Sequence, residues 1–257
     1  MARVDMEKGK LTLLSGSCYL PKERDSKPQG DDAHFICIDK QTIGLADGVG
    51  GYSNKGIDAG VYARELIMNA ENATKNLQMD QLTPIRVLTE AYGRTKARGA
   101  STACIITLDN NNRLLAANVG DCRFMVIRNG AHIFKSPIQQ RGFNCPFQLG
   151  NEGSNNKPGD AEVFIISVEA GDVIVAGTDG VFDNLFETQI EELVWGGIQQ
   201  GLDPEEIAWS VAQQAYFVSM DRQALTPFMN ASRNAQRNHS GGKQDDITVI
   251  ISCVIGS

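Results

Sequence analysis

Acidic residues stand at the ends of three apolar segments of this 257-residue chain. The segments and their acids are 43–46 followed by Asp47-Gly48, 173–178 followed by Asp179-Gly180, and 247–254 preceded by Asp245-Asp246. Mg²⁺ and Mn²⁺ prefer carboxylate, carbonyl and water oxygens in octahedral geometry. A single Asp-Gly pair is also a common turn dipeptide. The combination of three such ends therefore indicates a divalent-metal site.

Hydrophobic periodicity predicts the elements that would position these acids. Strands are expected at 33–38, 43–46, 101–108, 113–119, 122–128, 131–135, 162–168, 173–176 and 247–254. Helices are expected at 57–77, from Thr83-Pro84 onward, and at 187–199 and 203–219. Asn129-Gly130 between two strand segments predicts a tight hairpin. The segments 136–160 and 220–244 show little periodicity and are expected to be loops.

The number of hairpins and the two pairs of helices predict an α+β fold. We expect a four-layer α-β-β-α sandwich, in which two antiparallel sheets pack together and a helix pair covers each outer face. No Pro/Ser-rich linker or charge block divides the chain. Residues 1–257 are therefore expected to form a single domain, with a recognisable core from about 11 to 254.

Composition limits the classes of partner. The net charge of −7 disfavours a nucleic-acid partner, since acidic proteins repel phosphate backbones. No apolar run has the length of a membrane span, and the N-terminal MARVDMEKGK lacks the apolar core of a secretion signal. Six scattered cysteines without a Cys-x-x-Cys pair predict reduced thiols. We expect a soluble intracellular protein of the cytoplasm, or of the mitochondrion or chloroplast if a transit peptide has been removed.

Six stretches carry a family resemblance in a fixed order. They are GDDAHF (30–35), GLADGVGG (44–51), GASTACIITL (99–108), ANVGDCRFMVIRNG (117–130), VIVAGTDGVFDNL (173–185) and GGKQDDITVII (241–251). With them the chain resembles the PPM family, the metal-dependent type 2C serine/threonine protein phosphatases. Its Ala-Asp-Gly-Val-Gly-Gly motif, together with QQRGFNCPFQLG (139–150) and TPFMNAS (226–232), looks like a branch of plants, fungi and animals that is often found in organelles.

The resemblance implies a set of primary metal ligands. Asp47 would bridge two metal ions, and the carbonyl of Gly48 would help to hold the second. Asp179 and Asp245 would complete the protein ligands of the first ion. Asp32 would act mainly through metal-bound waters.

Three further acids have less certain roles under the resemblance. Asp121 and Asp183 match positions that can hold a third metal ion, although a turn acid and a helix cap are equally open interpretations. Asp246 would cap or orient rather than bind metal.

The resemblance implies hydrolysis of phosphoserine and phosphothreonine in proteins. A water or hydroxide that bridges two Mg²⁺ or Mn²⁺ ions, with two or three ions per chain, would attack phosphorus directly. The metal ions would offset charge on the phosphate oxygens, so no protein nucleophile is required.

Two positions depart from the family pattern. Val49 stands where many relatives have a histidine proposed as general acid, and losing such an acid typically costs ~10²–10⁴-fold in rate. Lys27 has the spacing of the usual phosphate-binding arginine, and Arg24 lies three residues earlier. Lysine supplies charge but not the bidentate fork of a guanidinium.

Three other functions compete with this one. Cys18 to Arg24 formally fits the Cys-x₅-Arg loop of cysteine phosphatases, but the intervening residues contain a proline and no glycine. A catalytically weak PPM-fold scaffold is a second alternative, although such proteins usually show eroded metal ligands. A metal nuclease is disfavoured by the net charge. The sequence leaves the substrate, the resident metal and the oligomeric state open.

Overall fold

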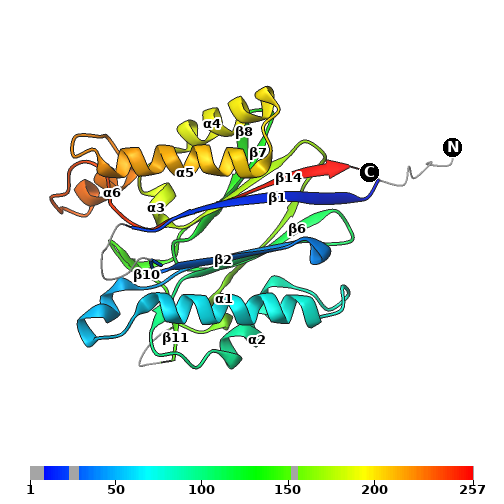
Figure 1. Cartoon of the computed structure of the whole chain (residues 1–257), viewed down its shortest axis with the longest axis horizontal. Helices are drawn as coiled ribbons and strands as arrows, with labels where there is room; N and C mark the ends of the chain where they lie inside the picture. The colour runs from blue at the N-terminus through cyan, green and yellow to red at the C-terminus, as the bar shows by residue number, and fades with distance from the viewer. Residues whose placement is uncertain (1–8, 23–28, 152–155, 257) are drawn as a thin grey trace.

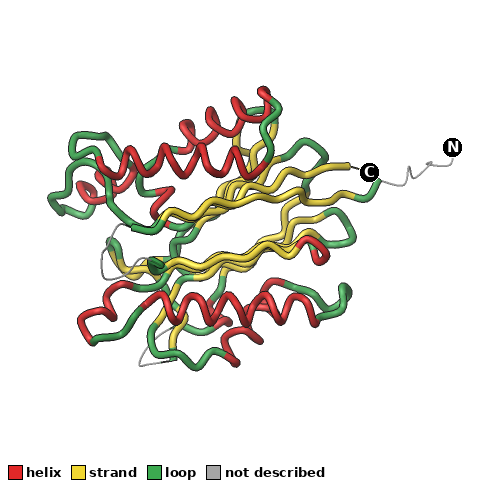
Figure 2. The backbone as a smooth tube through the Cα atoms, viewed as in Figure 1, coloured by secondary structure: helices red, strands yellow, loops and turns green. Residues whose placement is uncertain are grey.

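Two antiparallel sheets pack face to face, and helices cover both outer faces (Figures 1 and 2). The computed structural model describes residues 9–22, 29–151 and 156–256. The β14 sheet contains β1 (Leu11–Leu20), β14 (Ile247–Gly256), β13 (Val173–Gly177), β7 (Arg123–Arg128) and β8 (Ala131–Lys135), in that order. The β3 sheet contains β12 (Glu162–Ser167), β6 (Arg113–Val119), β5 (Ala103–Leu108), β3 (Thr42–Asp47) and β2 (Asp32–Cys37). The predicted α+β sandwich is confirmed.

Each helix pair packs on one sheet through an apolar core. The first pair is α1 (Ala59–Asn76) and α2 (Pro84–Arg94), whose buried Leu66 and Leu88 belong to a core shared with the β3 sheet. The second pair is α4 (Glu187–Gln200) and α5 (Pro204–Met220), which pack on the β14 sheet through residues such as Val211. A third core, with Phe124 at its centre, fills the space between the sheets. The four layers are thus held together by three apolar cores, one beneath each helix pair and one between the two sheets.

Local signals explain where several elements begin. The Asp58 carboxylate accepts a hydrogen bond from the Gly60 N–H (2.9 Å) and starts α1. Asp203 and Glu206 form a reciprocal capping box at the start of α5. The predicted hairpin joins β7 to β8, and both Asn129 and Gly130 have positive φ, as its tight turn requires.

The two segments predicted to be loops contain short elements, so that expectation was partly wrong. Residues 136–160 include β9 (Gln140–Gly142), β10 (Cys145–Pro146), β11 (Leu149–Gly150) and a 3-10 turn, Pro158–Asp160. Strands this short have no periodicity to detect, and β11 pairs with the distant β4 (Ala100–Ser101). Residues 220–244 include α6 (Pro227–Asn234), which is capped by the Thr226 hydroxyl.

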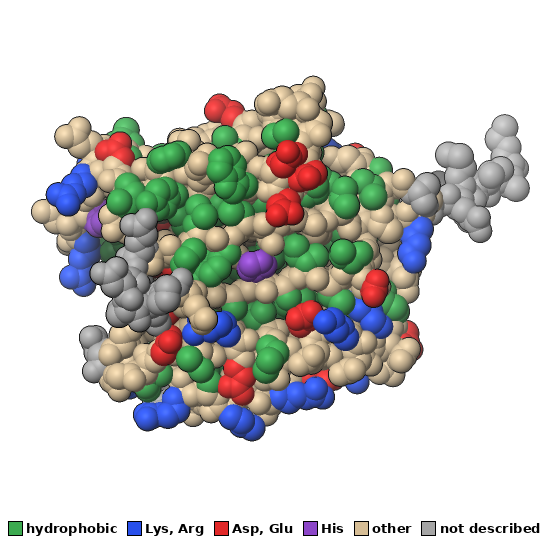
Figure 3. All heavy atoms as spheres, viewed as in Figure 1, with side chains coloured by type: hydrophobic (Ala, Val, Ile, Leu, Met, Phe, Trp, Pro, Cys, Tyr) green, Lys and Arg blue, Asp and Glu red, His purple; other side chains and the backbone are tan. Residues whose placement is uncertain are grey.

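Three remaining elements complete the description. They are the 3-10 turns Ile38–Lys40 and Gly50–Lys55 and the one-turn helix α3 (Asp179–Phe182). Apolar side chains remain exposed along α5, among them Trp209 and Phe217, and the face in Figure 3 shows apolar side chains gathered over this layer. None of the described helices is both long and apolar enough to span a bilayer.

Candidate metal centre

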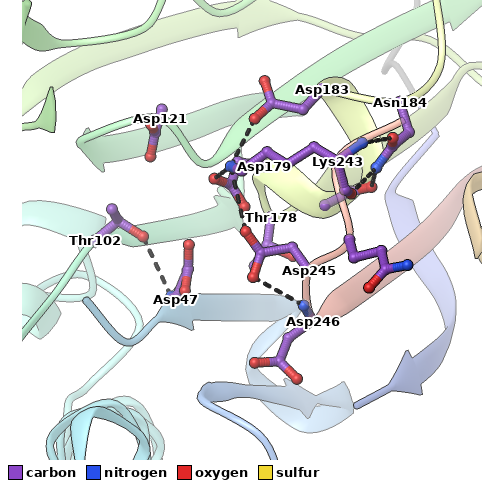
Figure 4. Close-up of polar contacts among 12 residues, drawn as sticks. Asp47, Thr102, Asp121, Thr178, Asp179, Asp183, Asn184, Lys243, Asp245 and Asp246 are labelled. Atoms are coloured by element: carbon purple, nitrogen blue, oxygen red, sulfur yellow. Dashed lines mark hydrogen bonds and ion pairs between the residues drawn. The ribbon is translucent and has the colours of Figure 1, made fainter. Parts of the chain in front are cut away.

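The predicted acids meet at one end of the two sheets because antiparallel neighbours alternate in direction (Figure 4). Asp47 ends β3, and its register partner Asp32 begins β2. In the β14 sheet, Asp179 follows β13 and Asp245 precedes β14, and these strands also pair antiparallel. Residues far apart in sequence are thus brought to one site.

An open cavity of about 420 Å³ lies at this end. It is lined by Asp47, Gly48, Asp179 and Asp245, all predicted from the sequence, and by Lys22, Asp31, Val49, Gly50, Gly51, Thr102, Asn144, Pro146 and Lys243. Gly48 is confined to glycine, because a Cβ there would lie 2.6 Å from the Ala59 carbonyl oxygen. The predicted phosphate-binding residues Lys27 and Arg24 lie outside the described residues.

Of the two acids of the β3 sheet, Asp32 is buried and Asp47 is half-buried at the cavity, and neighbouring acids repel both. Burial raises the pKa of Asp47, and the charges of Asp179, Asp32 and Asp245 raise it further. Burial and the charge of Asp246 likewise raise the pKa of Asp32 well above its usual range. Both carboxyl groups are therefore costly to ionise unless a cation is nearby.

Hydroxyl groups from the other sheet hold Asp32 in place. Its Oδ2 accepts hydrogen bonds from Thr178 Oγ1 (2.8 Å) and Thr248 Oγ1 (2.7 Å). These bonds connect β2 to the β13 and β14 ends across the gap between sheets. On the neighbouring strand, the backbone N–H of Asp47 donates to Thr102 Oγ1 (3.2 Å).

Asp121, Asp183 and Asp245 have the same electrostatic character. Burial, followed by the charge of Asp179, raises the pKa of Asp121 to about 7 and that of Asp245 to about 6. Burial also raises the pKa of Asp183. The Oδ2 of Asp121 accepts a hydrogen bond from Gln140 Nε2 (3.0 Å).

The donor set fits a hard divalent cation. Within the described residues, Oδ1 of Asp32, Asp121 and Asp179 is buried without a hydrogen-bond partner. Cations would satisfy these oxygens and relieve the repulsion among the carboxylates. In the same part of the chain no three Asp, Glu, His or Cys side chains form a ready-made single-ion site. A cation here would therefore keep several waters, as Mg²⁺ usually does.

Lys243, within the motif GGKQDDITVII, is a largely buried cation to which the sequence pattern assigns no role. Its Nζ pairs with Asp183 Oδ2 (2.7 Å), with Asp245 Oδ2 (3.2 Å) and with Asp179 Oδ2 (Figure 4). Burial alone would lower the pKa of Lys243, but the three carboxylates outweigh it and raise that pKa well above its usual range. Lys243 is therefore charged and partly neutralises the acidic cluster.

Asp246 is a positioning residue, in keeping with its expected orienting role. Its Oδ1 accepts from the Lys22 N–H (2.6 Å) and its Oδ2 from the Asp31 N–H (2.9 Å). The carboxylate is 2% exposed and holds two chain segments beside the cavity. The adjacent acids thus lie in different surroundings. Asp245 lines the cavity, whereas both carboxylate oxygens of Asp246 accept hydrogen bonds from backbone N–H groups.

The environment of Cys18 contradicts a cysteine nucleophile. Cys18 lies inside β1, opposite Val249, rather than at the start of a phosphate-binding loop. Burial and the charge of Glu205 raise the pKa of its thiol, which is the opposite of what a thiolate nucleophile requires. A hollow of about 480 Å³ beside Cys18 is lined by α5 residues including Trp209 and contains none of the predicted metal ligands.

Comparisons with known proteins agree with this fold and site. A family model described as Stage II sporulation protein E (SpoIIE) matches residues 39–255. The Arabidopsis thaliana protein "Probable protein phosphatase 2C 55" is 45% identical over 96% of this chain and 53% of its own length. The Danio rerio "Protein phosphatase PTC7 homolog" is 35% identical over 97% of this chain and 86% of its own length.

Solved structures give the same result. The photosystem II phosphatase PBCP superposes with a TM-score of 0.87 at 30% identity and covers 94% of this chain and 98% of that chain. The catalytic domain of the phosphatase PstP, solved with two manganese ions, shares the fold with a TM-score of 0.65 at 16% identity, over 95% and 99% of the two chains. The chain spans 53% and 60% of the plant relatives 2C 55 and 2C 80, respectively. It belongs to the PPM family, that of the metal-dependent type 2C protein phosphatases.

Proposed function

We propose that this protein is a metal-dependent serine/threonine phosphatase that hydrolyses phosphoserine and phosphothreonine in proteins by direct attack of water. The observation that carries the proposal is the convergence of Asp47, Asp179 and Asp245 in one open cavity. Family membership supports the same reaction. We also propose that the recognisable core, about 11–254, acts as one phosphatase domain.

In this proposal the cavity acids hold Mg²⁺ or Mn²⁺. Asp47, Asp179 and Asp245 would be direct ligands together with the Gly48 carbonyl, and Asp32 would act through waters. A divalent ion lowers the pKa of a coordinated water and offsets charge on phosphate oxygens. The Thr178 and Thr248 hydroxyls would keep Asp32 oriented toward this role.

Among the described residues that line the cavity, the cationic side chains are lysines and none is an arginine. Lys22 lines the cavity and donates to the Gln244 carbonyl (2.5 Å). We assign it a share in attracting the phosphate dianion, alongside the proposed Lys27 and Arg24. Val49 also lines the cavity and has no proton to donate, so solvent would protonate the leaving alkoxide.

The substrates would be phosphoproteins, since the cavity is open to a side chain presented from a larger surface. Asn144 and Pro146 form part of its wall and would contact the residues flanking the phosphate. An intracellular location, in the cytoplasm, mitochondrion or chloroplast, is proposed on the reduced cysteines and on the plant relatives.

The test is hydrolysis of p-nitrophenyl phosphate and of a phosphothreonine peptide with Mn²⁺, Mg²⁺ or EDTA. The wild type is compared with Asp47→Asn/Asp179→Asn and with a charge-matched control, Asp39→Asn/Asp80→Asn, whose acids are exposed and lie away from the cavity. We expect activity that requires metal, is lost in the site variant and is retained in the control. Turnover that survives both EDTA and the site substitutions would refute the metal mechanism. A folded, Mn²⁺-binding protein without turnover would favour the scaffold alternative.

A further inference from the structure

The ammonium group of Lys243 is saturated by carboxylates. An ammonium has three N–H donors, and Nζ of Lys243 has three acidic partners, Asp179, Asp183 and Asp245. The side chain is 13% exposed. Lys243 therefore functions as an internal cation of the cluster rather than as a free surface lysine.

The backbone around Lys243 is fixed, so this cation is preorganised. The Lys243 N–H donates to Asn184 Oδ1 (2.8 Å), and Asn184 Nδ2 donates back to the Lys243 carbonyl (2.8 Å). Asn184 is fully buried and also donates to the Gly180 carbonyl (2.9 Å). Nζ also lies over the Phe228 ring, 5.1 Å from its centroid. These contacts join Lys243 to the same short helix that carries Asp179.

The position of Nζ bears on how many metal ions the site holds. Asp183 matches a third-metal position, but its Oδ2 is bound to Nζ at 2.7 Å. Nζ also binds Asp179 Oδ2, so an ion shared by Asp179 and Asp183 would have to displace the ammonium. Asp121, the other third-metal candidate, accepts from Gln140 through Oδ2 only, and its partnerless Oδ1 remains available to the ions of the cavity without Asp183.

We propose that Lys243 is a tethered cation that takes the place of a further divalent ion between Asp179 and Asp183. The proposal rests on the proposed metal centre and refines it. The wild-type site then holds two divalent ions and the charge of Lys243 rather than three ions. Asp183 serves to anchor Lys243 and is not a metal ligand.

The test counts Mn²⁺ ions per chain by equilibrium dialysis with elemental analysis, and measures affinities by titration calorimetry. We expect two ions in the wild type and three in Lys243→Met, which keeps the length of the side chain and removes its charge. Lys243→Met/Asp183→Asn should return to two ions. Asp183→Asn alone should keep two ions, with affinities within about threefold of the wild type.

Two outcomes of the ion count would overturn the proposal. One is a count of three Mn²⁺ ions per chain in the wild type that falls to two in Asp183→Asn. The other is a count that stays at two ions per chain in Lys243→Met. If Lys243→Met does not fold, as judged by circular dichroism, Asp183→Asn alone decides between a lysine anchor and a metal ligand. Absence of Mn²⁺ binding by the wild type would overturn the metal centre itself as well as this inference.

Discussion

Asp245 and Asp246 are neighbours, yet the same Asp→Asn substitution should change the stability of the metal-free protein in opposite directions. Both oxygens of Asp246 accept backbone N–H groups, from Lys22 and from Asp31. Asp245 instead lines the cavity, where its partners are the Asp246 N–H (3.1 Å) and Lys243.

The two magnitudes follow from these contacts. In Asp246→Asn the amide NH₂ would face one of the two donors, so one hydrogen bond is lost and one buried N–H is left unsatisfied. Hydrogen bonds to charged groups contribute about 1.5–3 kcal/mol and an unsatisfied group costs about 1–3 kcal/mol, so we expect a loss of about 3–5 kcal/mol. The pKa of Asp245 is raised to about 6. Its ordinary value is 3.8, so the shift is about two pKa units; at about 1.4 kcal/mol per unit, neutral Asn at 245 should stabilise the metal-free protein by up to about 3 kcal/mol.

Urea unfolding in EDTA at pH 7.5 measures both effects, and repeating it with Mn²⁺ separates structure from metal binding. A ligand that binds only the folded state raises the unfolding midpoint. Mn²⁺ should therefore raise the midpoint of the wild type and of Asp246→Asn, but raise that of Asp245→Asn much less. The reasoning is refuted if Asp245→Asn lowers metal-free stability as much as Asp246→Asn does.

Three further predictions concern the rest of the fold. Burial lowers the pKa of His34 below its usual 6.5, so its contribution to folding stability is present above about pH 6.5 and is lost as the pH falls. His34→Gln should therefore reduce the loss of unfolding free energy between pH 7.5 and 5.5. An unchanged dependence of that free energy on pH would contradict this. Iodoacetamide should label exposed Cys145 in the folded protein but leave Cys104, whose pKa burial raises to about 12, unlabelled until urea unfolds it, as mass spectrometry would detect. Leu66→Ala in the α1 core should cost about 2–5 kcal/mol, whereas the exposed Met68→Ala should stay within about 0.5 kcal/mol; equal urea midpoints would contradict the assigned burial.

Much of the fold could be predicted because local signals and tertiary structure agree. Asn129-Gly130 has the backbone that its hairpin needs, and α2 begins at Thr83-Pro84, with Pro84 as its first residue. The acids at 47, 179 and 245 could be placed together, since each adjoins an apolar strand and antiparallel pairing aligns those ends. Thr226-Pro227 starts α6 with the same helix-start signal as Thr83-Pro84, but it lies in a polar segment whose composition favours a loop.

Other features depend on contacts that no local pattern encodes. The bond between Asp246 and the Lys22 N–H spans 224 positions of sequence. The two-residue strand β11 pairs with β4 through Leu149 and Ser101, and neither strand is long enough to show a periodicity. Lys243 reads as a solvated lysine in a polar loop. Its place inside the acidic cluster is set by the fold: Asn184 fixes its backbone, and Nζ pairs with three carboxylates.

The site itself is tested most directly by crystals of the protein grown with Mn²⁺, with diffraction recorded at the manganese absorption edge. Two anomalous peaks are expected in the cavity beside Asp47, Asp179 and Asp245, with Nζ of Lys243 still paired to Asp183. Mn²⁺ bound only elsewhere on the protein, with the cavity acids free of metal at saturating concentration, would contradict the assignment of this cavity as the metal centre.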